Sequence, residues 1–165
     1  MINAPRLYTH NLVTDLFGHS KCYVTAHVLR DLGLYPKRRE LTYREAAIYL
    51  YCLAASPGTD VEASVQRAAE EVTHIKLPNG QSFIDMFTMI LKNESFHSLR
   101  IIMFSQTGGM AYIEASDGID AVYLDERKPG AFLANANFYT GLPKNYLKFY
   151  AAIIKERNLT YEQLN

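Results

Sequence analysis

The spacing of apolar residues changes once along this 165-residue chain, and that change constrains the fold more than any single motif. Before the turn-forming sequence Pro78-Asn79-Gly80, apolar residues recur at intervals of three and four, as in amphipathic helices. Beyond the turn, after one more helical stretch at residues 82–92, they alternate with a period of two, as in strands. The sequence therefore predicts an α+β fold.

The N-terminal part is predicted to contain four helices. Their expected ranges are residues 9–17, 20–32, 42–56 and 59–72. The first two are joined by only a few residues and so predict a helix-turn-helix. Ser20 is the expected N-cap of the second helix, and Gly33 its end. Thr42 and Thr59 are each followed three residues later by a glutamate, which predicts a capping box at each.

The C-terminal part is predicted to be an antiparallel meander of three to four strands with flanking helices. Turns at Gly108-Gly109 and Asp117-Gly118 separate three β-rich runs, at residues 98–105, 109–116 and 119–126. Residues 132–139 predict a fourth strand, and residues 142–157 a closing helix. The expected organisation is a helical DNA-binding module, residues 1–77, followed by an α+β module for self-association, residues 78–165.

Composition limits the class of protein. With 48% hydrophobic and 21% charged residues, and no apolar run long enough for a bilayer or a secretory leader, a cytoplasmic globular protein is expected. The two cysteines, Cys22 and Cys52, fall inside helical patterns, so we expect them buried and reduced. Because His19, Cys22 and His27 lack a second half-site, we expect neither metal nor cofactor.

Charge is segregated along the chain. Seventeen basic and seventeen acidic residues cancel, so any attraction for a polyanion must be local. The segment from Lys21 to Arg44 contains six basic and two acidic residues. The segment from Glu45 to Glu71 contains five acidic residues and one basic residue. Segregated charge of this kind is typical of a protein that presents one charged face to a partner.

The basic stretch carries a resemblance to a known family. A helix with Leu29-Arg30 is followed by Gly33-Leu34, then by Pro36 to Arg39, and then by Tyr43-Arg44 at the next helix. This order resembles the winged helix-turn-helix of MerR-type regulators. The resemblance implies that Leu29-Arg30 lies on the recognition helix and that Pro36 to Arg39 forms the wing. The chain departs from the family in lacking its long dimerising helix.

The whole arrangement is also similar to small proteins of temperate phages and prophage-like elements. The similarity lies in the order of the segments: "HVLRDLGL", then "YREAAIYLYCLAAS", then the β-rich part and a terminal helix. The resemblance implies transcriptional control within a mobile element.

A DNA-binding role assigns distinct tasks to the candidate residues. Phosphate contacts are expected from Lys37, Arg38, Arg39 and Arg44. Base contacts are expected from Thr25 and Arg30, with Lys21 and Tyr23 reaching phosphate or sugar. Because so few contacts bind weakly, we expect a homodimer on double-stranded DNA.

Two alternatives stay open. The chain could be a protein-binding adaptor, or a phage inhibitor of a host protein, that uses the acidic helix Asp60 to Val72 or an open sheet edge. It could also be an enzyme, although no GxGxxG, phosphate-binding loop, GxSxG or HExxH occurs, so catalysis is not expected. The basic triplet could equally be a solvated loop, and the tyrosines are expected in the core.

Overall fold

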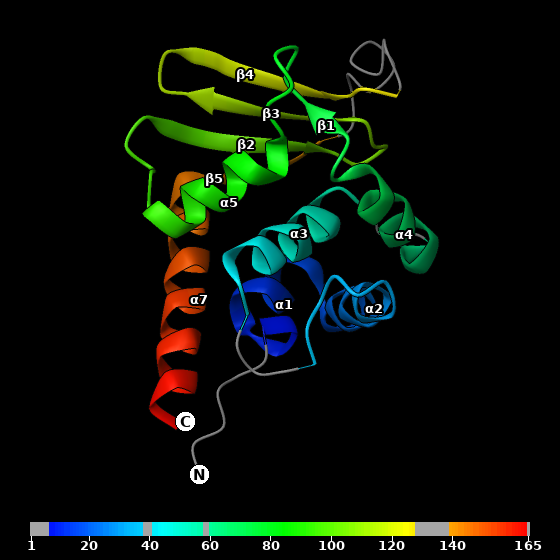
Figure 1. Ribbon diagram of the computed structural model, residues 1–165, viewed down its shortest axis with the longest axis vertical. Helices are drawn as coiled ribbons and strands as arrows, with labels where there is room; N and C mark the ends of the chain where they lie inside the picture. Colours follow the sequence, from blue (N-terminus) through cyan, green and yellow to red (C-terminus); the bar gives the residue numbers. More distant parts are fainter. Residues whose placement is uncertain (1–6, 38–40, 58–59, 128–138, 165) are drawn as a thin grey trace.

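The computed structural model describes residues 7–37, 41–57, 60–127 and 139–164, with side chains as far as Asn158. Its helices lie on one side of a five-stranded antiparallel sheet (Figure 1), which confirms the predicted α+β class. In chain order the elements are η1 (Leu7–Thr9), α1 (Asn11–Phe17), α2 (His19–Asp31), α3 (Tyr43–Ala54), α4 (Val61–Glu71), β1 (Ile75–Lys76), α5 (Phe83–Asn93), β2 (Leu99–Ser105), β3 (Met110–Ala115), β4 (Gly118–Asp125), β5 (Tyr139–Pro143) and α7 (Lys144–Leu164).

The sheet has the strand order β1-β4-β3-β2-β5. The central strands β2, β3 and β4 form the predicted meander, and the glycines at its two turns have positive φ, +89° at Gly108 and +138° at Gly118. Strand β5 extends the sheet beside β2 from Tyr139, whereas residues 132–138 of the predicted fourth strand lie outside the described residues. Strand β1 was not predicted, because two residues are too few to show a period.

Helix α3 lies at the centre of the molecule (Figure 1). Every residue from Ala46 to Ala55 is buried, because α2, α4, α5 and β2 all pack against this helix. The predicted capping box starts it: Glu45 N donates to Thr42 Oγ1 at 3.1 Å, and Thr42 N donates to Glu45 Oε1 at 3.0 Å.

Two other predicted helix starts are wrong. Helix α2 begins at His19 and not after a Ser20 cap, because Gly18, with φ of +88°, makes the whole turn from α1. The N-cap of α4 is Asp60, in the left-handed region and without a side-chain cap bond. Thr59, the predicted cap, lies outside the described residues.

One apolar core crosses the boundary predicted after residue 77. Phe83 of α5 lies 5.9 Å from the Tyr51 ring of α3, 5.8 Å from Phe104 of β2 and 5.2 Å from Tyr123 of β4, measured between ring centroids. The same buried cluster contains Leu29 of α2. The helical part and the sheet are therefore packed on shared side chains.

Buried tyrosines link helices through their hydroxyl groups. Tyr150 donates to Ala46 O at 2.6 Å, Tyr49 to Cys22 O at 3.3 Å and Tyr146 to Leu12 O at 2.9 Å. Burial raises the pKa of Tyr49 and of Tyr150 well above the usual value. Tyr49 and Tyr150 lie in the core as expected, while Tyr146 is partly buried against it, and the buried thiols of Cys22 and Cys52 are free.

We predict that buried tyrosines titrate late. Burial raises the pKa of Tyr35 to about 12 and that of Tyr51 well above 10. Since the folded chain keeps these protons after the unfolded chain has lost them, the free energy of unfolding falls as pH rises above 10. Absorbance at 295 nm should show an early and a late phase in the folded chain but one phase in urea. A single phase near pH 10 in the folded chain would contradict the model of a tyrosine-linked core.

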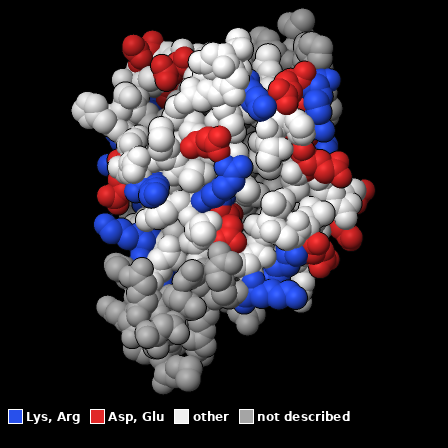
Figure 2. Space-filling view, viewed as in Figure 1, with Lys and Arg blue, Asp and Glu red and all other residues white. Residues whose placement is uncertain are grey.

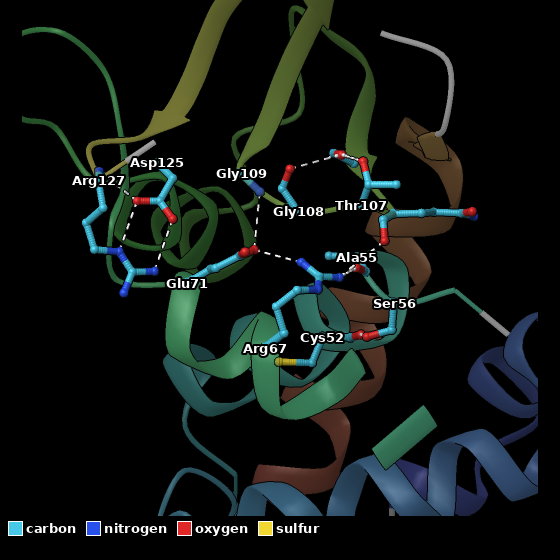
Figure 3. A network of polar contacts seen from close by, with 12 residues as sticks. Cys52, Ala55, Ser56, Arg67, Glu71, Thr107, Gly108, Gly109, Asp125 and Arg127 are labelled. Atoms are coloured by element: carbon cyan, nitrogen blue, oxygen red, sulfur yellow. Dashed lines mark hydrogen bonds and ion pairs between the residues drawn. The ribbon is translucent and has the colours of Figure 1, made fainter. Parts of the chain in front are cut away.

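A polar joint attaches α4 to the sheet (Figure 3). We define it as Arg67, Glu71 and the β2–β3 turn at residues 106–109. Arg67 Nη1 donates to Glu71 Oε2 at 2.8 Å, and Arg67 Nη2 donates to the carbonyl oxygens of Ala55 at 2.6 Å and Gln106 at 3.2 Å. Glu71 Oε2 also accepts Gly109 N at 3.2 Å. The joint fixes the end of α3, the middle of α4 and the turn to one another.

A second ion pair lies beside the joint (Figure 3). The Asp125 carboxylate is buried and accepts Arg127 Nε at 3.1 Å and Nη2 at 3.0 Å. Glu71 and Asp125 thus each have a guanidinium partner, and we assign both carboxylates a structural role.

Gly108 is required at the polar joint. A Cβ there would clash with Arg67 Nη1 and would lie 2.6 Å from Glu71 Oε2. Gly80 has the same φ of +89°, but a Cβ there would meet nothing within 4 Å.

We therefore predict unequal losses for two matched substitutions. Gly80→Ala should lower the free energy of unfolding by about 1–2 kcal/mol, the cost of the left-handed backbone alone. Gly108→Ala should cost more than Gly80→Ala, because it also displaces the side-chain ends of the partly buried Arg67–Glu71 ion pair. Urea denaturation measures both, and equal losses would show that the joint does not fix the turn.

Candidate nucleic-acid interface

The outward stripe of α2 carries rings instead of cations. His19, Tyr23, His27 and Asp31 are exposed and recur every four residues, so they lie along one side of the helix. Tyr23 is 54% exposed, and its ring centroid lies 4.3 Å from that of His27. His27 was not among the predicted site residues, although its spacing from Tyr23 could have indicated it.

The exposure expected of Thr25 is wrong. Its side chain is fully buried on the inward face of α2, with Cys22 and Leu29, and its hydroxyl donates to Lys21 O at 2.7 Å. A threonine on a helix can satisfy its hydroxyl on the preceding turn and so pack like an apolar residue. Thr25 therefore cannot contact a base without local unfolding.

Lys21 is folded back onto the protein. Its Nζ donates to Ser56 O at 2.7 Å, just beyond the end of α3, and lies 5.5 Å from the centroid of the Phe17 ring. Partial burial lowers the pKa of Lys21. A cation at the carbonyl end of a helix is favourable, so Lys21 stabilises α3 and is not directed outward to a phosphate.

Arg30 lies between two aromatic rings. Its guanidinium carbon is 5.4 Å from the ring centroid of Tyr8 in η1 and 5.4 Å from that of Tyr35, which follows α2. The Nε of Arg30 is buried without a hydrogen-bond partner, as is the hydroxyl of Tyr35. The rings thus hold the cation in place while part of its hydrogen-bonding capacity stays unused.

The basic loop, defined as residues 37–39, is anchored on both sides. Lys37 is exposed, while Arg38 and Arg39 lie outside the described residues. Before the loop, Tyr35 and Pro36 are buried. After it, Leu41 N donates to Asn158 Oδ1 at 3.1 Å, and Asn158 Nδ2 donates to Leu41 O at 2.9 Å. Helix α7 therefore fixes the point at which the loop returns to the core.

Arg44 is directed toward α5. It forms an ion pair with Asp85, and both side chains are largely exposed, Arg44 at 48% and Asp85 at 65%. Exposed pairs of this kind contribute roughly 0–1 kcal/mol, so Arg44 gains little from the contact. The structure therefore does not bring Arg44 together with Arg30.

Arg157 of α7 is a cation that the sequence pattern did not single out. It is buried, and burial lowers its pKa, with the neighbouring positive charge of Arg30 adding to that effect. The charges of Tyr35 and Glu45 act in the opposite direction. No local signal marks Arg157, because its neighbours come from α2, the following loop and α3.

Charges of both signs alternate over the face shown in Figure 2, so this face has no broad field of one sign. The acidic helix α4 presents Asp60, Glu62 and Glu70 to solvent, while Glu71 is buried in the polar joint.

Within the described ranges, no group of three or more His, Cys, Asp or Glu residues is placed to hold a metal ion. None of the helices there combines the length and apolarity needed to cross a bilayer. Comparison of the chain with protein-family models, curated proteins and solved structures finds no match.

Proposed function

We propose that the protein is a DNA-binding transcriptional regulator, cytoplasmic and of the temperate-phage or mobile-element type, whose affinity comes from phosphate contacts of the basic loop. The supporting observation is the anchoring of that loop. Pro36 is buried before it, and Leu41 is bound to Asn158 after it, so the two ends of the loop are fixed to the core.

Base contacts are reassigned within α2. Since Thr25 is buried and Lys21 is bound to Ser56, we assign the base contacts to the two exposed rings in the middle of the outward stripe, Tyr23 and His27. A histidine can donate or accept hydrogen bonds at base edges, and a tyrosine can reach phosphate or sugar.

Self-association is part of the proposal, because a few phosphate contacts on a neutral chain bind weakly. In the described residues β1 pairs with β4 only at Leu124 and Asp125, so most of the outer side of β4 is unpaired. Ile119 on this strand is 61% exposed. We place the contact between two copies at the β4 edge.

We predict that the basic loop carries DNA affinity. Replacing Lys37, Arg38 and Arg39 together by alanine should weaken binding to duplex DNA at least about tenfold, because three phosphate contacts are removed. Fluorescence anisotropy with the DNA upstream of the gene measures the affinity. A charge-matched control replaces the exposed Lys92, Arg100 and Lys148 by alanine and should bind like the unmodified chain. If the two triple variants lose DNA affinity equally, the basic loop does not make the proposed phosphate contacts.

The salt dependence of DNA binding distinguishes the cations of the basic loop from Arg44. Each single alanine in the basic loop should lower the slope of log Kd against log salt by about 0.9, one phosphate contact each. Arg44→Ala should leave the slope unchanged, because the Arg44 side chain is directed toward Asp85 of α5 and not toward α2. A reduced slope for Arg44→Ala would show that this residue leaves Asp85 to contact DNA.

The open β4 edge also favours the second candidate function, an adaptor or inhibitor that binds a host protein by strand addition. Copurification of one stoichiometric protein, together with no affinity for DNA at low salt, would support the adaptor and contradict the regulator. An Ile119→Lys variant should lose that partner while keeping its fold.

A further inference from the structure

The sheet has an outer face that none of the described helices covers. These helices all lie on the opposite side of the sheet (Figure 1). Ile102 and Phe104 of β2, Ile113 of β3 and Tyr123 of β4 point to the helical side and belong to the buried core. Because successive side chains of a strand point to opposite faces, the residues beside them in each strand form the outer face.

This outer face is mostly apolar. We define it by six residues, namely Ile101, Met103, Tyr112, Glu114, Ile119 and Val122. Tyr112 lies opposite Met103 on one side and Val122 on the other, and Glu114 lies between residues of β2 and β4 in the next row. All six are at least partly exposed. Five of the six are aliphatic or aromatic, so the face presents a continuous apolar surface across three strands.

The pattern of β2 is unusual for a sheet with one face in water. Such an antiparallel sheet normally alternates apolar and polar side chains. Residues 101–104 of β2 are instead four successive apolar residues, Ile-Ile-Met-Phe. Continuous apolar runs are typical of strands that are buried on both faces, and a contiguous apolar surface indicates contact with another molecule.

The charges at this face are complementary to themselves. The Arg100 side chain is 66% exposed, and its Nη1 lies 3.6 Å from Glu114 Oε1. A partner with one sign of charge would match only one member of this pair, and a phosphate backbone would be repelled by the carboxylate. An identical face turned about a two-fold axis presents the two charges in the reverse order, so each Arg100 meets the Glu114 of the other copy.

We propose that two copies of the chain pack their outer faces against each other, as the two sheets of a β-sandwich do. Sheets packed in this way lie about 10 Å apart, and their facing side chains interdigitate. Met103 and Tyr112, from neighbouring central strands, would then be removed from water. The inference goes beyond the proposed function: pairing at the β4 edge extends the sheet in its own plane and leaves the outer face uncovered, so the two contacts do not compete.

Met103→Lys tests the outer face, and Met89→Lys is the matched control. Met89 is 50% exposed but lies on α5, on the helical side of the sheet. In a single copy a lysine at position 103 can extend to water, so the fold should be kept, as circular dichroism can verify. Sedimentation equilibrium of the full chain should show a self-association step whose Kd rises at least about tenfold in Met103→Lys, because an ammonium group would be buried in the contact. Met89→Lys should leave this Kd unchanged.

An exchange of charges tests the same contact without changing its apolar part. Arg100→Glu should raise the Kd of self-association, because carboxylates then meet across the two copies. Adding Glu114→Arg should restore the original Kd, and the fold should tolerate both changes because exposed ion pairs contribute little to stability. The contact would be overturned by a chain that does not self-associate, by an equal Kd in Met103→Lys, or by no recovery in the double variant.

Titration of the same variants with duplex DNA distinguishes this inference from the proposed function. Met103→Lys should bind DNA like the unmodified chain, because the phosphate contacts are assigned to the basic loop. Self-association that depends on Met103 in a chain without DNA affinity would keep the contact and remove the regulator. DNA binding by a chain that does not associate through this face would keep the regulator and overturn the contact, as would a host protein that occupies the face instead of a second copy.

Discussion

The burial of α3 on every side is the constraint on which the rest of the structure depends. From Ala46 to Ala55 no side of this helix is open to solvent. Its side chains pack against α2, α4, α5 and the sheet. Polar side chains of other helices bond carbonyl groups of α3 and its end: Tyr150 of α7 donates to the Ala46 carbonyl, and Lys21 of α2 donates to the Ser56 carbonyl just beyond the last turn. The candidate interface is a consequence, because Lys21 and Thr25 are committed to this packing and only the opposite side of α2 faces outward.

The same packing accounts for the position of the basic loop. The chain leaves α2 through the buried Tyr35 and returns at Thr42, the N-cap of the central helix. Helix α7 fixes the return through the two hydrogen bonds between Asn158 and Leu41. The two ends of the basic loop are thus fixed to the core, which supports the proposed local phosphate contacts on a chain with no net charge.

Local patterns predicted most of the fold and little of the site. Periodicity located α3 and the three strands of the meander, because Thr42, Glu45 and the turn glycines act within a few residues of their effect. The two-residue β1 and the polar joint depend on contacts between distant segments, which no local pattern records. Thr25 illustrates the limit at the site: a polar residue on a helix is expected outside, yet its hydroxyl is satisfied by Lys21 O and its helix face is buried.

Chemical-shift mapping of the full chain with a short duplex tests the central claim most directly, because it reports which surface meets DNA without altering the protein. The account places the largest amide and side-chain shifts around the basic loop, at Lys37 and Leu41, and on the outward side of α2 at Tyr23 and His27. Shifts confined to α4 or to the open edge of β4, or no shifts at low salt, would contradict it.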